Sequence, residues 1–501
     1  MSGKTVTFKK ALQPIDRLAL TAMLVLLVLI GMLLLSGDQT APRVRAFSWE
    51  DKQVGAKDTA FMLTFSRPMN HASVEANLKI TPSIPGKVSW AGRRMAYTPL
   101  FPVPYGNKYQ IQLNGATDQF SGPKGKGTQM EPFTASFRTR DRAFAYVGVD
   151  GQEQGRLILY NLTSQQKSIL TPEDIVVMDF KVYPDGDRIL FSASERKNQE
   201  KGLLEQQLYT VSTGLSFDTT DSSPEPAGRI NLVLDSKKYQ NLKFDLSSDG
   251  KKIVVQRVNR NNPSDFGLWI VQPNAEPKPL GNQPGGDFVI APDSASVAVA
   301  QGQGVAILPL TSSTAKALDF LPKFGMVLNF AQDGSAAAMV KFNQDFTRSL
   351  FLVNNQGVQK ELLRTTGSIL RCEFTPTKDT LYCLLTQLVE GTQEYQEEPF
   401  LAAVDLKAPN DSQQLPVKPL VSLPNQRDIQ ISLSPDGLAL LFDQLGTKPP
   451  DATDTMRTNE GQAIATGLLW LLPLVNNTQS NTPTQLQPEQ LLPGFHPRWL
   501  P

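Results

Sequence analysis

Residues 178–192 read MDFKVYPDGDRILFS, which is a short apolar strand, a Pro-Asp-Gly turn and a second apolar strand. Pro and Asp suit the first corners of a tight turn, and Gly accepts the positive φ that the turn requires. Variants of this strand-turn-strand unit recur five more times along the chain. The other units are LKFDLSSDGKKIVVQ (242–256), GDFVIAPDSASVAVA (286–300), LNFAQDGSAAAMV (328–340), RCEFTPTKDTLYCLL (371–385) and IQISLSPDGLALLFD (429–443). Their turns are about forty to sixty-five residues apart, a spacing typical of the four-stranded blades of a β-propeller.

The two ends of this repeat region complete the pattern. Residues 143–149, 156–162 and 167–170 look like the outer three strands of a blade whose first strand is missing. Residues 497–501 look like a first strand with nothing after it. A single blade cannot bury both faces of its sheet, so blades pack side by side around a ring. We therefore predict a seven-bladed propeller over 141–501, closed by pairing of its N- and C-terminal strands; six blades with stray ends is the alternative.

The region 44–140 is predicted to be a separate all-β domain. It alternates short apolar runs with turn residues, which is typical of β-strands. The candidate strands are VRAFSW, AFMLTF, NLKIT, KVSW, RMAYTP, KYQIQL and FTASFRT. About seven short strands in a hundred residues is what an Ig-like β-sandwich requires.

The chain resembles two known families. Over 44–140 it resembles the bacterial SbsA-type Ig-like domain, through an ordered series of motifs. These are Phe65-Ser66-Arg67-Pro68-Met69, Thr98-Pro99, Tyr105-Gly106-Asn107-Lys108-Tyr109, a turn with Asp118 and Gly122, and Phe137-Arg138-Thr139. The repeats resemble the TolB-type, WD40-like propeller family, most clearly at YPDG (183–186) and SPDG (434–437). The first resemblance implies a spacer or adhesion module on a bacterial surface, and the second implies only a fold, because such propellers serve many functions.

The N-terminal segment is predicted to cross a membrane once. Residues 18–35 (LALTAMLVLLVLIGMLLL) contain no charge, and a helix of that length spans roughly 27 Å, about the thickness of a bilayer core. Four basic side chains precede it, which places residues 1–17 in the cytoplasm as a tail. We expect residues 18–36 to be an uncleaved signal-anchor helix in the inner (plasma) membrane, with the rest of the chain in the periplasm or extracytoplasmic space. A cleaved signal peptide is the competing interpretation, although SGDQTAPRV offers no clear cleavage site.

Composition and motifs argue against several kinds of function. The 49 basic and 48 acidic side chains are nearly balanced, which argues against nucleic acid as the main partner. With only two cysteines and two histidines, a Cys/His zinc site is excluded, because such a site needs about four ligands close together. His71 and His496 stand outside any nucleophile motif, and no G-x-S-x-G sequence occurs. We therefore predict that the protein is not an enzyme and has no catalytic, metal or cofactor residues, although paired acids from distant blades stay open.

Two further patterns are interpreted as structural. An acidic cluster within one predicted loop consists of Glu390, Glu394, Glu397 and Glu398. Carboxylate-rich loops are usually only solvated, so we expect no metal there. The glycine pairs in Gly285-Gly286 and Gly125-Lys126-Gly127 lack the strand-glycine-helix context of a phosphate-binding loop.

Cys372 and Cys383 lie symmetrically about the turn of the fifth repeat. In an antiparallel hairpin this spacing places the two residues opposite each other. An exported location permits a disulfide, so we predict a possible Cys372–Cys383 bond. Two free, buried thiols are the alternative.

The loops between the second and third strands of the blades are predicted to form the binding face. In a propeller they lie on the face opposite to the Asp-Gly turns, and long loops on a rigid scaffold are where binding usually occurs. These loops cover 193–205, 258–266, 342–348, 387–399 and 443–466. We predict a membrane-anchored extracytoplasmic binding or scaffold protein for an envelope protein or a cell-wall polymer. A propeller hydrolase or lyase acting on envelope glycans, and a sensor for a small ligand, are the alternatives.

Overall fold

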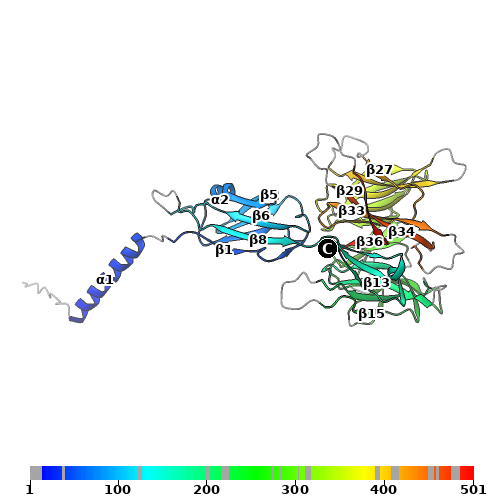
Figure 1. Cartoon of the computed structure of the whole chain (residues 1–501), viewed down its shortest axis with the longest axis horizontal. Helices are drawn as coiled ribbons and strands as arrows, with labels where there is room; N and C mark the ends of the chain where they lie inside the picture. Colours follow the sequence, from blue (N-terminus) through cyan, green and yellow to red (C-terminus); the bar gives the residue numbers. More distant parts are fainter. Residues whose placement is uncertain are drawn as a thin grey trace, which may run out of the picture. The chain divides into compact units, whose positions relative to one another are not determined.

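The computed structural model describes most of the chain (Figure 1). The described residues are 14–36, 40–121, 127–197, 202, 204–215, 225–273, 275–280, 285–302, 304–310, 318–389, 395–407, 417–448, 456–458, 462–474 and 486–501. Helix α1 (Pro14–Ser36) comes first and covers the apolar segment 18–35. Within the described residues, no helix combines the length and the hydropathy of a membrane-spanning segment.

Two four-stranded sheets and one short helix form the first β-rich region. One sheet contains, in spatial order, β1 (Val44–Phe47), β3 (Phe61–Phe65), β6 (Arg94–Pro99) and β5 (Gly86–Ala91). The other contains β2 (Gln53–Val54), β8 (Phe133–Thr139), β7 (Lys108–Leu113) and β4 (Leu78–Thr81). The seven predicted strands are confirmed, and the two-residue β2 and the helix α2 (His71–Asn77) are additional.

Alternating side chains fill the space between these two sheets. On β3, Phe61, Leu63 and Phe65 are fully buried, whereas Met62 between them is 45% exposed. The rings of Phe47 on β1 and Phe133 on β8 lie 6.4 Å apart, so the two sheets face each other. This packing is that of a β-sandwich.

Seven further sheets follow within the described residues, each of four antiparallel strands. The first contains β9 (Ala143–Val147), β10 (Leu157–Asn161), β11 (Gln166–Ile169) and β36 (Phe495–Trp499). The next three contain β12 (Ile175–Val182), β13 (Arg188–Glu195), β14 (Gln207–Ser212) and β15 (Ile230–Leu234); β16 (Tyr239–Leu246), β17 (Ile253–Asn259), β18 (Phe266–Val271) and β19 (Lys278–Pro279); β20 (Phe288–Ile290), β21 (Ser296–Gln301), β22 (Gly304–Pro309) and β23 (Asp319–Leu321). The last three contain β24 (Met326–Phe330), β25 (Ala336–Phe342), β26 (Arg348–Asn354) and β27 (Gln359–Thr365); β28 (Ile369–Phe374), β29 (Thr380–Leu388), β30 (Glu397–Asp405) and β31 (Val417–Ser422); β32 (Ile431–Leu433), β33 (Ala439–Thr447), β34 (Ile464–Pro473) and β35 (Glu489–Pro493).

The six predicted strand-turn-strand units are confirmed as the first two strands of six of these sheets. In the first unit, for example, Val182 on β12 lies opposite Ile189 on β13. The remaining sheet, which contains β9, combines strands from both chain ends as predicted, because β36 pairs with β9 and places Trp499 opposite Phe144. Strands more than three hundred residues apart in the sequence are therefore neighbours in one sheet.

The turns within the repeats use positive φ at one fixed position. Gly186, Gly250, Gly334 and Gly437 have φ of 69°, 68°, 71° and 73°. The third and fifth repeats lack this glycine, and Ser294 and Lys378 adopt φ of 55° and 55° in its place. The turn geometry is thus common to all six units, and glycine is the residue that adopts it at least cost.

Buried apolar clusters join each sheet to the next. One cluster, for example, combines Val340 and Leu350 of the β24–β27 sheet with Leu381 and Val404 of the β28–β31 sheet. Similar clusters lie between the two sheets of each remaining successive pair, and one joins the last sheet to the first. The sheets thus bury one another's faces, which is the packing principle of a β-propeller.

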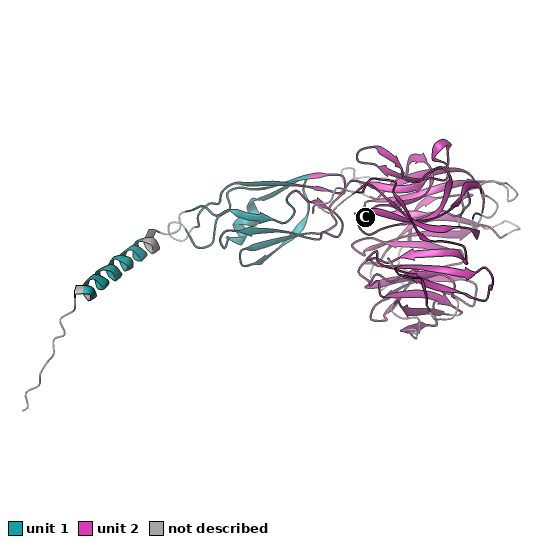
Figure 2. Ribbon diagram, turned by 90° about the horizontal axis from the view of Figure 1, so that it is seen from below, with its two compact units in different colours: residues 1–50, 60–98, 109–136 teal, residues 51–59, 99–108, 137–501 magenta. Residues whose placement is uncertain are grey.

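The chain divides into two compact units, shown in teal and magenta in Figure 2. Residues 51–59 and 99–108 belong to the second unit, together with everything from Phe137 onward. Within that unit the Asp436 carboxylate, which is buried in the turn of the last repeat, accepts a hydrogen bond of 3.0 Å from the Tyr105 backbone N–H. The Lys57 ammonium donates to the Pro184 carbonyl oxygen at 3.3 Å. Both segments therefore contact Asp-Gly turns of the sheets.

Candidate functional site

Four exposed apolar side chains lie where second and third strands connect in two neighbouring sheets. They are Phe342, Phe346, Leu388 and Tyr395, which we call the aromatic loop cluster, and they are 58%, 90%, 38% and 70% exposed. Phe342 ends β25, and Phe346 lies in the connection from β25 to β26. Leu388 ends β29, and Tyr395 lies in the connection from β29 to β30. Both connections were predicted as binding loops from the sequence, although these particular residues were not singled out.

The connection that carries Phe346 is held in one conformation by its own hydrogen bonds. The Asn343 side-chain amide donates to Thr347 Oγ1 at 3.1 Å and to Ser349 Oγ at 2.8 Å. The Asp345 carboxylate accepts from the Thr347 hydroxyl at 2.6 Å and also pairs with Arg364. Phe346 itself has φ of 63°, an unusual value for a non-glycine residue. The loop therefore presents the Phe346 ring to solvent.

Polar contacts tie the two connections together. Arg348 Nη1 lies 3.8 Å from Glu397 Oε1 across the two sheets, and the Tyr395 hydroxyl donates to the same carboxylate oxygen. Burial acts to raise the pKa of Glu397, but hydrogen bonds from Thr386 and Tyr395 outweigh it and lower that pKa. The ionised Glu397 carboxylate thus contacts side chains of both connections, Arg348 and Tyr395.

Exposed aromatic side chains held in place are typical of interaction sites. Single exposed apolar residues are common, but a group of them on a surface marks binding of a protein, a membrane or a ligand. Aromatic residues also dominate the binding energy of protein interfaces, because they bury a large area and lose little conformational entropy. The aromatic loop cluster is therefore a candidate binding surface among the described residues.

A second polar group lies along the first strands of three sheets and the second strand of a fourth. It comprises Asp179, Arg371, Glu373, Asp443, His496 and Arg498, which we call the inner-strand charge cluster. His496 Nε2 lies 3.1 Å from Asp179 Oδ1, and the His496 backbone N–H donates to Asp443 Oδ2 at 2.6 Å. Arg498 Nη1 lies 3.9 Å from Glu373 Oε1. The cluster joins β36 to its neighbours β12, β28 and β33.

The carboxylates of this cluster are engaged in holding strands together. Glu373 Oε2 accepts from the Leu433 backbone N–H at 2.6 Å, and Asp443 Oδ1 accepts from the Gln430 backbone N–H at 2.7 Å. Burial lowers the pKa of His496, so its imidazole is neutral at pH 7, and its Nε2 faces Asp179. Burial and the neighbouring Arg498 lower the pKa of Arg371 to about 10, which leaves it charged. Each acid of the cluster therefore has a partner on a neighbouring strand.

Asp443 makes a testable contribution to the pH dependence of stability. Burial raises its pKa from 3.8 to about 6, so the folded protein binds a proton more tightly than the unfolded chain does. The free energy of unfolding gained from this group is therefore present at low pH and is lost as the pH rises from 3.8 to about 6, at about 1.4 kcal/mol per pH unit. We expect Asp443→Asn to remove this slope. Urea unfolding of both proteins across that range checks it, and parallel slopes would contradict the assignment.

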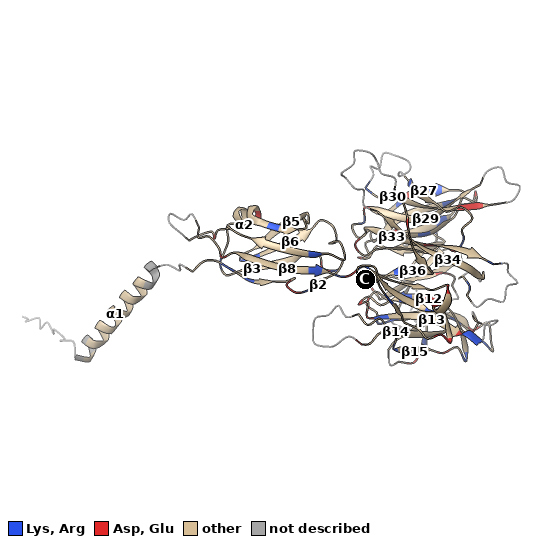
Figure 3. Ribbon diagram, in the orientation of Figure 1, with Lys and Arg blue, Asp and Glu red and all other residues tan. Residues whose placement is uncertain are grey.

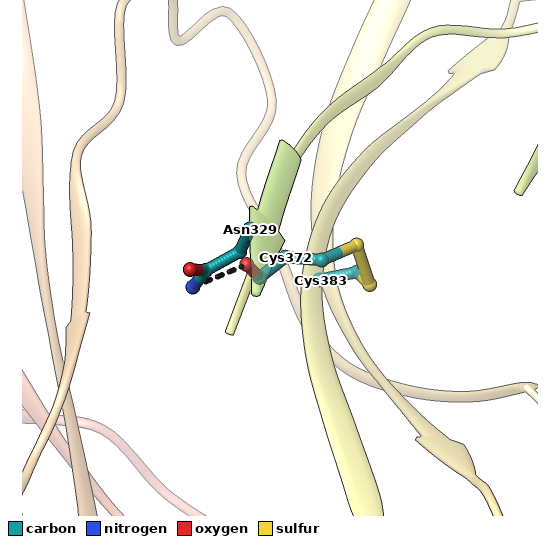
Figure 4. The surroundings of a disulfide bond; sticks show 3 residues. All are labelled: Asn329, Cys372 and Cys383. Atoms are coloured by element: carbon teal, nitrogen blue, oxygen red, sulfur yellow. Dashed lines mark hydrogen bonds between the residues drawn. A yellow bond between two sulfur atoms is a disulfide. The ribbon is translucent and has the colours of Figure 1, made fainter. Parts of the chain in front are cut away.

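Cys372 and Cys383 form a disulfide between β28 and β29, with an S–S distance of 2.03 Å (Figure 4). The two residues lie directly opposite each other in the strand pair, and both are buried. The Asn329 side-chain amide donates to the Cys372 carbonyl oxygen at 3.2 Å. The bond thus lies in the apolar cluster between the β24–β27 and β28–β31 sheets.

The other candidates from the sequence are dispersed. Of the acidic loop, Glu390 and Glu394 lie outside the described residues, whereas Glu397 and Glu398 lie on β30. His71 stacks on the Trp90 indole in the first unit, with ring centroids 4.1 Å apart. Among the described residues, no group of three or more His, Cys, Asp or Glu side chains could hold a metal ion.

The remaining predictions concern loops and glycines. Gly285 and Gly286 precede the strand β20 rather than a helix, while Gly125 and Lys126 lie outside the described residues. The loops 193–205, 387–399 and 443–466 are described only in part. His496 is the residue whose role the sequence did not reveal, because its charge cluster forms only when β36 lies between distant strands.

The comparisons with known proteins identify one of the two regions. Residues 38–139 match the family model of a bacterial Ig-like domain. None of the curated proteins matches the chain. TolB from Acinetobacter baumannii is similar in structure, with a TM-score of 0.40, 12% identity, and coverage of 85% of this chain and 83% of that one. An oligogalacturonate lyase from Vibrio parahaemolyticus gives a TM-score of 0.42 and 11% identity over 68% of this chain and 93% of that one. Residues 38–139 thus match a bacterial Ig-like domain, and the solved structures similar to the chain include TolB.

Proposed function

We propose that this chain is a membrane-anchored extracytoplasmic binding scaffold that presents the aromatic loop cluster to a protein of the cell envelope. The observation that carries the proposal is the exposure of Phe346 and Tyr395 on two adjoining, hydrogen-bonded connections. The opposite ends of the sheets carry the Asp-Gly turns, two of which contact residues 51–59 and 99–108 of the same unit. The face that carries the connections between second and third strands is therefore less covered by other segments of the unit.

The scaffold part of the proposal is a closed propeller of seven blades. Its support is the set of four-stranded sheets, the pairing of β36 with β9, and the apolar cluster that joins the last sheet to the first. A six-bladed ring would exclude the β9–β11 sheet, and neither face of that sheet would then pack against a neighbouring sheet. Rigid closure matters for binding, because loops on a rigid scaffold lose less conformational entropy when a partner binds.

The anchoring part of the proposal rests on α1 and on the location that follows from it. Residues 18–35 contain no charge, and the coloured part of α1 bears neither acidic nor basic residues (Figure 3). Large apolar side chains from Leu18 to Met32 are exposed on every side of the helix, which water disfavours and a bilayer accommodates. The disulfide is consistent with an oxidising compartment outside the cytosol.

Binding is favoured over catalysis because the acids of the inner-strand charge cluster are engaged. A glycan lyase or hydrolase needs a carboxylate pair that faces the substrate. Asp179, Glu373 and Asp443 instead contact His496 and backbone N–H groups of neighbouring strands. We therefore place the function on the exposed face rather than along the inner strands.

The test is affinity purification of the full chain from gently solubilised membranes, comparing variants. We expect the double variant Phe346→Ala/Tyr395→Ala to recover at least ten-fold less of the protein partner, since interface aromatics contribute about 2 kcal/mol or more each. Phe120→Ala is the matched control, because Phe120 is 73% exposed in the first unit and should leave recovery unchanged. Equal recovery by the double variant and the wild type would refute the proposed face. Recovery of polysaccharide in place of protein would refute the partner class.

A further inference from the structure

We propose that the second unit has a separate binding site for a small aromatic organic acid, at the ends of the first strands beside the Asp-Gly turns. A cavity of about 640 Å³ lies there. Small-molecule sites typically have volumes of about 300–1,000 Å³ and mostly apolar walls with a few polar groups. The site lies at the opposite end of the second strands from the aromatic loop cluster, so it does not depend on the proposed function.

The wall of this cavity has a regular origin in the fold. Five first strands each contribute their final residue to it, and these residues are Val182, Phe330, Phe374, Leu433 and Trp499. Because equivalent positions of successive sheets point the same way, the three aromatic side chains come together although they are far apart in the sequence. Flat rings on several sides of a cavity favour a flat, apolar ligand body.

The cavity is held open by rigid turns. Pro184, Pro376 and Pro435 of three repeats line it, and the pyrrolidine ring fixes the backbone φ at each position. In the fifth repeat, Thr375 Oγ1 donates to Asp379 Oδ1 at 2.8 Å, and in the sixth, Ser434 Oγ donates to Asp436 Oδ1 at 2.6 Å. A ligand would therefore enter a largely preformed site.

The charges around the cavity favour an anionic group on the ligand. Its lining includes three basic residues, Lys57, Arg140 and Lys378, and two acidic residues, Asp333 and Glu373. Arg140 Nη1 donates a hydrogen bond of 2.9 Å to the oxygen of Pro501, which also lines the cavity. Asp333 pairs with Lys378 at 2.5 Å, and Glu373 accepts the Leu433 N–H and faces Arg498. The carboxylates are thus neutralised locally, and the Lys57 ammonium, whose bond is to the Pro184 carbonyl, remains for a carboxylate or sulfonate.

The probe for the test is 1-anilinonaphthalene-8-sulfonate, an aromatic anion whose fluorescence rises in apolar sites. Titration of the folded full-length protein should give saturable binding of one molecule per chain, with energy transfer from tryptophan because Trp499 lines the cavity. Phe374→Ala should weaken binding at least ten-fold by removing one wall. Lys57→Glu alters an exposed side chain and reverses the local charge, so it should weaken binding at least three-fold while the unfolding temperature stays unchanged.

The matched control is Phe346→Ala in the aromatic loop cluster, which should bind the probe like the wild type. Absence of saturable binding, or binding that both Phe374→Ala and Lys57→Glu leave intact, would overturn the proposal. Loss of binding in Phe346→Ala would assign the probe to the other face and would overturn it as well. Should Phe374→Ala fail to fold, Lys57→Glu decides the question alone.

Discussion

Deletion of residues 494–501 is expected to prevent the second unit from folding, although these residues are few and lie at the end of the chain. The deletion removes β36, which supplies the first strand of the β9–β11 sheet. It exposes the full edge of β9, whose side chains are buried along its entire length. Exposed apolar edge strands promote aggregation, so we expect the truncated protein to be recovered in insoluble form.

The single substitution Trp499→Ala measures the contribution of β36 to stability without removing the strand. Trp499 is 7% exposed, packs on Phe144 with ring centroids 5.8 Å apart, and donates its backbone N–H to Ser432 Oγ at 3.1 Å. Replacing a buried aromatic side chain with alanine costs about 3–5 kcal/mol. We expect the unfolding transition of the second unit to move to lower urea by that amount, while Trp499→Phe loses much less.

The control for this experiment is Trp90→Ala in the first unit. Trp90 is half-buried and packs on His71 and Phe65, all within that unit. Its replacement should leave the transition of the second unit in place. If Trp499→Ala leaves that transition unchanged, β36 is not part of the folded sheet and the closed propeller is wrong.

Removal of the disulfide is the second large effect that we expect. The bond closes a loop with a sequence separation of 11 residues, and the chain-entropy model assigns such a loop about 2–3 kcal/mol. The double variant Cys372→Ala/Cys383→Ala should therefore unfold at lower urea than the oxidised wild type by that amount. The difference should largely disappear when both proteins are unfolded in the presence of a reductant, because the wild type then lacks the cross-link too.

Mass spectrometry gives an independent measure of the same bond. Alkylation of the denatured protein should add no mass without reductant and two alkyl groups with it. Two alkyl groups without prior reduction would show free thiols, which was the alternative interpretation of the sequence. The single variant Cys383→Ala is a useful control, since it should react once in either condition.

If both predictions hold, stability and binding are divided between different parts of the second unit. The inner-strand charge cluster, β36 and the disulfide stabilise the arrangement of the sheets. The aromatic loop cluster contributes little to that stability, because its side chains are exposed. Substitutions at Phe346 or Tyr395 should accordingly reduce binding without lowering the free energy of unfolding.

Local sequence patterns determined most of the turns and strands of this protein. The Asp-Gly turns and their flanking apolar runs predict the six hairpins, because turn conformation and strand alternation depend on neighbouring residues. The same reasoning predicts the seven strands of the Ig-like domain and the opposition of Cys372 and Cys383 across a hairpin.

The tertiary structure alone decided which side chains meet across distant strands. The pairing of His496 with Asp179, the engagement of Asp443 and the joining of Phe330, Phe374 and Trp499 at one cavity all depend on the order of the sheets. A sequence read along the chain gives residue types and local conformation, and its two matching ends predict the pairing of β36 with β9, but it does not specify which individual side chains meet across distant strands. The physical reason is that these contacts depend on how neighbouring sheets pack, which local turn and strand patterns do not specify.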